Sequence, residues 1–282
     1  MIIWLASYPK SGNTWLRSLL SSYYFSEDGN FDFNLLKEID SYPSAFYFKK
    51  YKDNFSSPVS TSKYWIAEQE NINKDKKTRF FKTHNAMVKI NGHSFTDKSN
   101  TLGAIHIVRD PRNIITSLAN HYSIEKEEAF DFMMTENKGI IQKVEDRYLG
   151  FNAICSWNFH EKSWSDCKQF PVMTIKYEDL QNQILKTFEK VIAFISGLTN
   201  SKETFNFDKA KKTVQSCSFK NLSKLEDEKG FDEAVINKRN NNKVKFFNLG
   251  IDSRYQNLLT KDLIDKANLK FRDNLIKYGY EL

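Results

Sequence analysis

The chain has 282 residues, of which 40% are hydrophobic and 15% aromatic, so it carries enough apolar surface for a sizeable core. The formal net charge is +7, but acidic residues interrupt the basic ones almost everywhere, which favours a small polyanionic ligand over a broad nucleic-acid surface. Three widely spaced cysteines, Cys155, Cys167 and Cys217, argue against a disulfide framework or a structural zinc. The first residues contain neither a basic leader nor a long apolar segment, and we expect a cytoplasmic protein without a membrane anchor.

Short apolar runs alternate with amphipathic segments along the chain. Strands are predicted over residues 2–6, 78–82, 104–108 and 171–175, and helices over 14–24, from 110 onward, and over 180–196. This alternation predicts an α/β fold, a single three-layer domain over residues 1–282 with a mostly parallel central sheet and helices on both faces. Residues 25–77 are aromatic and polar with weak periodicity, and residues 221–250 are rich in Lys, Asn, Asp and Glu and are expected to be mobile. We expect both segments to cover the ligand crevice.

The loop between the first strand and the first helix has the composition of a phosphate-binding loop. Gly12 permits a tight turn, Lys10 adds a positive charge, and Ser11 and Thr14 add hydroxyl donors beside a helix N-terminus. Its lysine precedes the single glycine, so it is not a Walker A loop, in which lysine and a hydroxyl residue follow the second glycine. The structural alternative is an ordinary turn with a surface lysine.

The order Tyr-Pro-Lys-Ser-Gly-x-Thr-Trp over residues 8–15 closely resembles the 5′-phosphosulfate loop of sulfotransferases that use 3′-phosphoadenosine 5′-phosphosulfate (PAPS). The resemblance covers most of the chain. It implies a P-loop NTPase-like fold, PAPS as cosubstrate, adenosine 3′,5′-bisphosphate (PAP) as product, and no metal. It also implies that the 5′-phosphate is held by Lys10, Ser11, Gly12, Asn13 and Thr14, with Asn13 in place of the family's usual threonine.

A second resemblance lies in residues 108–117, Val-Arg-Asp-Pro-Arg-Asn-Ile-Ile-Thr-Ser. In similar sulfotransferases an arginine at a strand end and a serine eight residues later hold the 3′-phosphate, which implies this role for Arg109 and Ser117. A guanidinium suits phosphate because it donates two parallel hydrogen bonds. The structural alternative is that Arg109 pairs with a carboxylate of the protein.

A third resemblance is Lys82-Thr83-His84 after the predicted strand 78–82. Similar enzymes carry Lys-Thr-His there, which implies His84 as the general base, Lys82 beside the sulfuryl oxygens and Lys10 beside the leaving phosphate. His106 lies within a predicted strand and is expected in the core. The other histidines, His93, His121 and His160, belong to no motif, and no pair of histidines has metal-ligand spacing.

Adenine recognition is implied by the resemblance for three aromatic residues. Trp15 and Phe219 would sandwich the base and Tyr177 would contact its edge, since stacking on an aromatic ring contributes about 1–3 kcal/mol per base. Core packing is the alternative for Trp15 and Phe219.

The family's closing Arg-Lys-Gly motif reads Asn248-Leu249-Gly250 in this chain. Gly250 can still offer a backbone N–H, but the second 3′-phosphate arginine is missing. We therefore expect residues 238–255 to fold over the cofactor and to supply a replacement cation, the candidates being Arg239, Lys243, Lys245 and Arg254.

The sequence thus predicts a sulfotransferase that moves a sulfuryl group from PAPS to a hydroxyl or amine of a small molecule, by in-line displacement. No nucleic-acid or membrane partner is expected. Two alternatives stay open, a Mg²⁺-dependent P-loop kinase and a nucleotide-binding module without turnover. Aromatic residues are frequent in segments 41–63 and 121–164, the candidate acceptor-lining regions.

Overall fold

The computed structural model of the chain describes residues 1–202, 204–237, 241–248 and 254–282. The chain divides into two compact units. Unit 1 contains Met1–Tyr8, Lys37–Val108 and Glu136–Phe205, and unit 2 contains Pro9–Leu36, Arg109–Thr135 and Asn206–Leu282. The predicted single domain over residues 1–282 stays a prediction.

Unit 1 is built on a five-stranded parallel sheet with the strand order β2-β3-β1-β6-β9. The strands are β1 (Ile2–Ser7), β2 (Asp40–Ser41), β3 (Arg79–Thr83), β6 (Thr101–Val108) and β9 (Val172–Lys176). Central strand β1 is buried at every position, which explains its continuous apolar sequence, because a strand covered on both faces shows no polar alternation.

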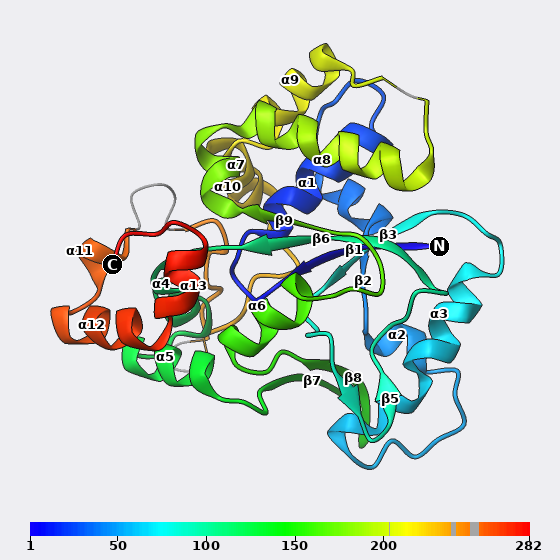
Figure 1. Cartoon of the computed structure of the whole chain (residues 1–282), viewed down its shortest axis with the longest axis horizontal. Helices are drawn as coiled ribbons and strands as arrows, with labels where there is room; N and C mark the ends of the chain where they lie inside the picture. The colour runs from blue at the N-terminus through cyan, green and yellow to red at the C-terminus, as the bar shows by residue number, and fades with distance from the viewer. Residues whose placement is uncertain (203, 238–240, 249–253) are drawn as a thin grey trace. The chain divides into compact units, whose positions relative to one another are not determined.

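Helices cover both faces of this sheet (Figure 1). A Cβ built on Gly103 of β6 would lie 2.6 Å from the Leu198 side chain of α8 (Ile184–Thr199), so this helix packs closely over β6 at the glycine. His106 lies three positions further along β6, and its ring faces Trp164 of α6 (Trp157–Ser165). Because successive strand residues point to opposite faces, α8 and α6 lie on opposite sides of the sheet.

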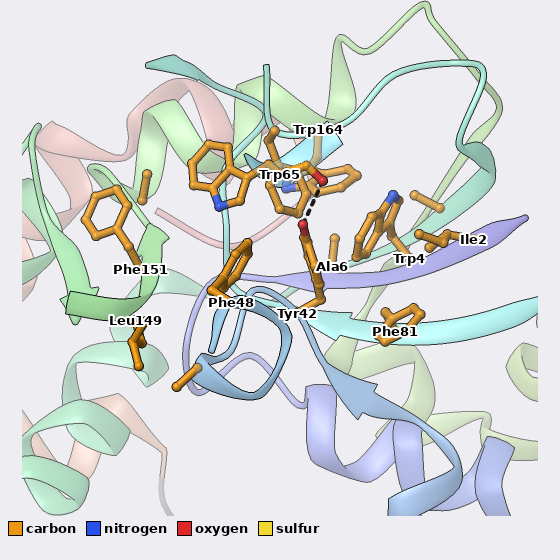
Figure 2. Packing of buried hydrophobic residues seen from close by; sticks show 14 of the residues in the cluster. Ile2, Trp4, Ala6, Tyr42, Phe48, Trp65, Phe81, Leu149, Phe151 and Trp164 are labelled. Atoms are coloured by element: carbon orange, nitrogen blue, oxygen red, sulfur yellow. Dashed lines mark hydrogen bonds between the residues drawn. The ribbon is translucent and has the colours of Figure 1, made fainter. Parts of the chain in front are cut away.

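A large aromatic core fills unit 1 on the side of the sheet that Trp4 faces (Figure 2). Trp4 packs against Tyr42, Phe81 and Phe95 with ring centroids 5.1–6.0 Å apart. The Tyr42 hydroxyl donates a 2.7 Å hydrogen bond to the main-chain oxygen of Trp65, so its polar end is satisfied inside the core.

The remaining elements of unit 1 are short. They include the hairpin of β7 (Gly139–Val144) and β8 (Arg147–Ala153), the pair β4 (Lys89–Ile90) and β5 (His93–Ser94), and helices α2 (Ala45–Phe48), α3 (Trp65–Asn73) and α7 (Tyr177–Asn182). Two 3₁₀ helices are also present, η1 (Phe33–Glu38), which crosses the unit boundary, and η2 (Pro58–Tyr64).

The described elements lying wholly in unit 2 are helices apart from one isolated bridge between Ile236 and Lys243. They are α1 (Asn13–Phe25), α4 (Pro111–Tyr122), α5 (Lys126–Met134), α9 (Phe207–Ser216), α10 (Phe219–Lys229), α11 (Tyr255–Leu258), α12 (Lys261–Lys270) and α13 (Arg272–Lys277). Buried Arg112 ties three of them together, because it pairs with Asp110 at 2.7 Å, donates to Asn268 and lies under the Tyr255 ring.

The predicted α/β fold with a mostly parallel sheet and helices on both faces is confirmed, and the four predicted strands correspond to β1, β3, β6 and β9. The predicted helix 180–196 is wrong at its start, because Gln183 leaves the helical conformation (φ −140, ψ 49) and separates α7 from α8. Residues 221–229 were expected to be mobile and are instead helical in α10, whose N-cap Ser218 accepts from the amide of Asn221.

Candidate functional site

The predicted phosphate loop of unit 2 turns sharply into α1. Lys10 and Gly12 both have positive φ, 68° and 100°, and α1 begins at Asn13. Glycine suits the second position because it has no Cβ to resist the left-handed conformation. Ser11 is 1% exposed, and its buried hydroxyl has no hydrogen-bond partner among the described residues. The loop therefore combines helix N-terminal amides with an inward hydroxyl, which is what a phosphate oxygen requires.

Arg109 lies against this loop. Its Nη1 donates a 3.0 Å hydrogen bond to the main-chain oxygen of Lys10. The neighbouring carboxylate of Asp110 pairs with Arg112 and caps α4 through the Arg112 amide. Ser117 lies half-buried on α4. The structure thus brings Arg109 to the predicted phosphate loop.

Two residues that belong to no predicted motif contact this loop. Glu233 accepts from the Thr14 hydroxyl at 3.1 Å and from Arg17 at 2.7 Å. The Phe246 ring lies 3.7 Å from the Lys10 ammonium, as a cation–π contact. Both come from a segment more than 200 residues away in sequence, and local spacing carries no signal for such contacts.

The segment that bears Phe246 is held by Glu226. This buried carboxylate accepts from the amides of Phe246 and Phe247 at 2.6 and 2.8 Å. The next residue, Asn248, donates to Asn120 of α4 at 3.0 Å. Residues 246–248 are therefore anchored to α10 and α4 inside unit 2.

The predicted adenine residues are divided between the units. In unit 2, Trp15 of α1 donates to the main-chain oxygen of Cys217 at 3.0 Å, two residues before Phe219 begins α10. Trp15 and Phe219 are both half-buried, so neither ring is fully used by the core. Tyr177 begins α7 in unit 1 and is also half-buried.

Four cations were predicted as replacements for the missing arginine. Lys245 pairs with Asp227 at 2.6 Å, whereas Lys243 and Arg254 are exposed. Arg239 lies outside the described residues, as does the predicted cofactor ligand Gly250. The identity of the replacement cation stays a prediction.

His84 of unit 1 follows β3 directly and is held by the end of β1. Its Nδ1 lies 2.8 Å from the main-chain oxygen of Ser7 and 3.4 Å from the Ser7 hydroxyl. A carbonyl oxygen only accepts, so we assign the proton of the neutral ring to Nδ1, and Nε2 then carries the lone pair. The half-buried ring is consequently held in the tautomer that can accept a proton at Nε2.

Lys82 and His106 complete the predicted set in unit 1. Lys82 lies on β3 two residues before His84 and is 8% exposed. His106 is 1% exposed on β6, so its predicted place in the core is confirmed. His160, which belongs to no motif, is also fully buried, and its ring faces His106 with centroids 6.0 Å apart.

The described residues contain no group of three or more His, Cys, Asp or Glu side chains arranged to hold a metal ion. Among the same residues, no helix has the length and apolar character needed to cross a bilayer.

A glycine-turned loop that follows a parallel strand and opens a helix defines a phosphate-binding α/β protein. Comparison with known proteins identifies the class further: the family model described as "Sulfotransferase domain" matches residues 2–279. The chain belongs to the sulfotransferase family, and the prediction of a PAPS-dependent sulfotransferase is confirmed.

Two curated relatives come from Arabidopsis thaliana. Cytosolic sulfotransferase 5 is 24% identical over 98% of this chain and 80% of its own length, and cytosolic sulfotransferase 13 is 24% identical over 96% and 76%.

Solved structures share the fold at lower identity. Mouse sulfotransferase SULT7A1 complexed with PAP has a TM-score of 0.57 and 19% identity, covering 97% of this chain and 84% of that one. Retinol dehydratase in complex with androsterone and inactive cofactor PAP has a TM-score of 0.59 and 12% identity, covering 97% and 80%.

Proposed function

We propose that this sulfotransferase acts on a small-molecule acceptor in the cytoplasm, with His84 as the general base. The acceptor hydroxyl or amine attacks sulfur and gives its proton to Nε2 of His84. A bond forms between the acceptor atom and sulfur as the bond from sulfur to the 5′-phosphate oxygen breaks. The electron pair of the broken bond stays on that oxygen, so the products are a sulfated acceptor and PAP.

The observation that carries this proposal is the hydrogen bond between His84 Nδ1 and the Ser7 carbonyl. An imidazole that donates from Nδ1 to a fixed carbonyl keeps one tautomer and one ring orientation. Its other nitrogen is then available as a base without a proton shift between the ring nitrogens. A histidine that served only to fill space would not need this polar restraint.

The residues of unit 2 have the cofactor roles in this proposal. Backbone amides at the start of α1 and the hydroxyls of Ser11 and Thr14 bind the 5′-phosphate, while Lys10 neutralises charge on the leaving oxygen. The other cofactor roles are 3′-phosphate binding by Arg109 and Ser117 and adenine stacking by Trp15 and Phe219. Lys82 of unit 1 neutralises the sulfuryl oxygens.

The acceptor class follows from chemistry rather than from a defined pocket. Retinol dehydratase, a structural neighbour, was solved with androsterone and with retinol, both small apolar molecules with a hydroxyl group. We extend only the class to this chain: a small molecule that presents a hydroxyl or an amine. The named relatives are cytosolic, which supports the same compartment here.

The test replaces the His84 side chain and leaves the residues around it unchanged. His84→Ala should lower kcat by about 10²–10⁴-fold, the usual contribution of a general base, and leave the Kd for PAP nearly unchanged. Turnover is measured with PAPS and three probe acceptors: 2-naphthol, benzyl alcohol and benzylamine.

Two further variants separate the base from a structural role. His84→Asn retains an N–H that can donate to the Ser7 carbonyl but has no basic nitrogen, so it should be as impaired as His84→Ala. His93→Ala removes an exposed histidine of β5 in the same unit and should behave as wild type. Full activity in His84→Asn would show that the histidine acts only through its hydrogen bond.

A further inference from the structure

One face of α6 supports the backbone that follows His84. Trp164 Nε1 donates a 3.0 Å hydrogen bond to the main-chain oxygen of Asn85, and the Ser163 hydroxyl accepts from the amide of Met87 at 3.0 Å. His160 stands three and four positions before these residues. Positions with that spacing share one face of a helix, so His160 belongs to the same row.

Residues 85 and 86, which follow His84, are also bound by strand β8. Buried Asn85 accepts from the amide of Ala153 at 2.7 Å, and the Ala86 amide donates to the Ala153 carbonyl at 2.8 Å. Residues 85–87 are thus bound on two sides. The His84 ring, directly before this segment, contacts the main-chain oxygen and the hydroxyl of Ser7.

His160 lies beside both chain segments that the Ser7–His84 contact joins. The ring of Tyr8, which follows Ser7, meets the His160 ring edge-on at 90° with centroids 5.5 Å apart. Trp164 and Ser163, on the same face of α6, bond to residues 85 and 87, so this face also runs along the chain directly after His84. The His84 backbone raises the pKa of His160, in keeping with this placement. His160 therefore borders the end of β1 and the end of β3, the two segments that the Ser7–His84 hydrogen bond joins.

The two ring nitrogens of His160 are buried polar atoms. The side chain is 0% exposed, and neither Nδ1 nor Nε2 makes a hydrogen bond of good geometry to a described residue, although the His84 backbone is close enough to raise its pKa. Burial lowers the pKa of His160 well below its ordinary value, and positive charge on His106 or His84 would lower it further, against a smaller opposing effect of the His84 backbone. The ring is neutral, so it has one N–H to donate and one nitrogen to accept. Buried groups of this kind bond to protein or to an internal water.

We propose that His160 is a positioning residue for His84, which it restrains by donating a ring N–H, directly or through one buried water, to the main-chain carbonyl of His84. This inference rests on the proposed role of His84 as the base. With Nδ1 tied to Ser7 and the main chain tied to His160, the ring keeps its Nε2 directed at the acceptor. His160 itself does not touch the reacting atoms.

The experiment compares His160→Phe with His160→Gln. Phenylalanine fills the aromatic site without a donor, whereas glutamine retains an N–H. Misplacement of a catalytic group by about 1 Å can reduce the rate about 100-fold, so His160→Phe should lower kcat with PAPS and 2-naphthol about 10- to 100-fold. The KM for PAPS should stay within about twofold, since no cofactor contact is lost. His160→Gln should recover most of the lost kcat, and Phe159→Leu, an exposed neighbour on α6, should match wild type.

A double-mutant cycle with His84→Ala separates this inference from the proposed function. If His160 acts through His84, then His160→Phe has little further effect once His84 is alanine. Equal losses in both backgrounds, or equal kcat values for the phenylalanine, glutamine and wild-type enzymes, would overturn the positioning role. If His84→Ala itself remains fully active, the proposed base is wrong, whatever His160 does.

The state of the His160 ring can also be measured in the wild-type enzyme, so this test does not depend on whether a variant folds. In ¹⁵N-labelled protein the His160 ring should be neutral at pH 6, with an N–H proton that exchanges slowly because it is buried and hydrogen-bonded. A charged ring, or an N–H that exchanges as fast as that of exposed His93, contradicts the proposal.

Discussion

At the scale of single residues, Arg109 has one observed and one proposed function, which can be separated by experiment. Its hydrogen bond to the Lys10 carbonyl supports the phosphate loop, and its guanidinium is proposed to bind the 3′-phosphate. Arg109→Ala should therefore weaken PAP binding more than adenosine 5′-monophosphate binding. A charge-assisted hydrogen bond contributes about 1.5–3 kcal/mol, which corresponds to roughly 10- to 150-fold in Kd.

Calorimetry with both nucleotides measures the two contributions. The loss common to both ligands reports support of the loop, and the extra loss for PAP reports the 3′-phosphate. Arg272→Ala, which removes an exposed arginine of α13, is the matched control for net charge. Equal losses for PAP and adenosine 5′-monophosphate would restrict Arg109 to the loop.

At the scale of elements, Glu233 places a carboxylate at the N-terminus of α1. Glu233 bonds to the Thr14 hydroxyl, a donor that the proposed 5′-phosphate site also uses. Negative charges favour helix N-termini, and two of them near one terminus repel each other. Glu233→Gln should therefore tighten PAP binding, by about 2- to 5-fold if one such interaction contributes 0.5–1 kcal/mol.

A substitution of the neighbouring Asp232 controls for the change of net charge in Glu233→Gln. Asp232→Asn makes the same change of net charge at an exposed position and should leave the Kd for PAP unchanged. The difference between the two variants should shrink at high salt if repulsion is its cause. Weaker binding in Glu233→Gln would mean that the carboxylate mainly orders Thr14 and Arg17 for the cofactor.

Residues 241–248 belong to the segment 238–255 that is predicted to fold over the cofactor. Its Phe246 and Phe247 amides already bond to buried Glu226, so the segment has a defined anchor in unit 2. PAP should slow hydrogen exchange further across residues 241–248, because Phe246 also contacts Lys10 of the phosphate loop. Identical exchange rates with and without PAP, at saturating concentration, would remove this closure from the mechanism.

Local chemistry explains which elements the sequence could predict. The wholly buried strand β1, the Asp-Pro start of α4 and the glycine turn before α1 each depend on residues adjacent in the chain. Short β2 and the 3₁₀ helix η2 lie in a segment with weak periodicity, where Tyr42, Val59 and Tyr64 pack on the aromatic core. The contacts of Glu233, Phe246 and His160 join distant parts of the chain, and no spacing rule predicts those.

At the scale of the whole molecule, the proposed catalytic base and the proposed phosphate loop belong to different units of the chain. The chain passes from unit 1 to unit 2 directly after Tyr8 and again after Val108, close to the ends of β1 and β6. The base His84 and its supports belong to unit 1, and the loop that carries Lys10 belongs to unit 2. The stability of the base's surroundings can therefore be probed through residues of unit 1 alone.

The buried His160 ring predicts how stability depends on pH. Burial lowers the pKa of His160 well below 6.5 in the folded protein, with His106 and His84 adding to the shift. As the pH falls through the ordinary value near 6.5, the unfolded chain takes up a proton that the folded protein does not. The free energy of unfolding must then fall with decreasing pH, by at most about 1.4 kcal/mol per pH unit for one such group. Above that pH the ring is neutral in both states and contributes no slope.

Urea unfolding between pH 5 and 8 tests this on wild type and His160→Phe. The wild type should lose more stability than the variant between pH 7 and pH 5, because phenylalanine binds no proton in either state. Above pH 7 the two curves should run parallel. His93→Phe removes an exposed histidine and should keep the wild-type pH dependence. If wild type and His160→Phe run parallel over the whole range, the buried ring takes up its proton in the folded state as readily as in the unfolded chain, and His160 is not held neutral.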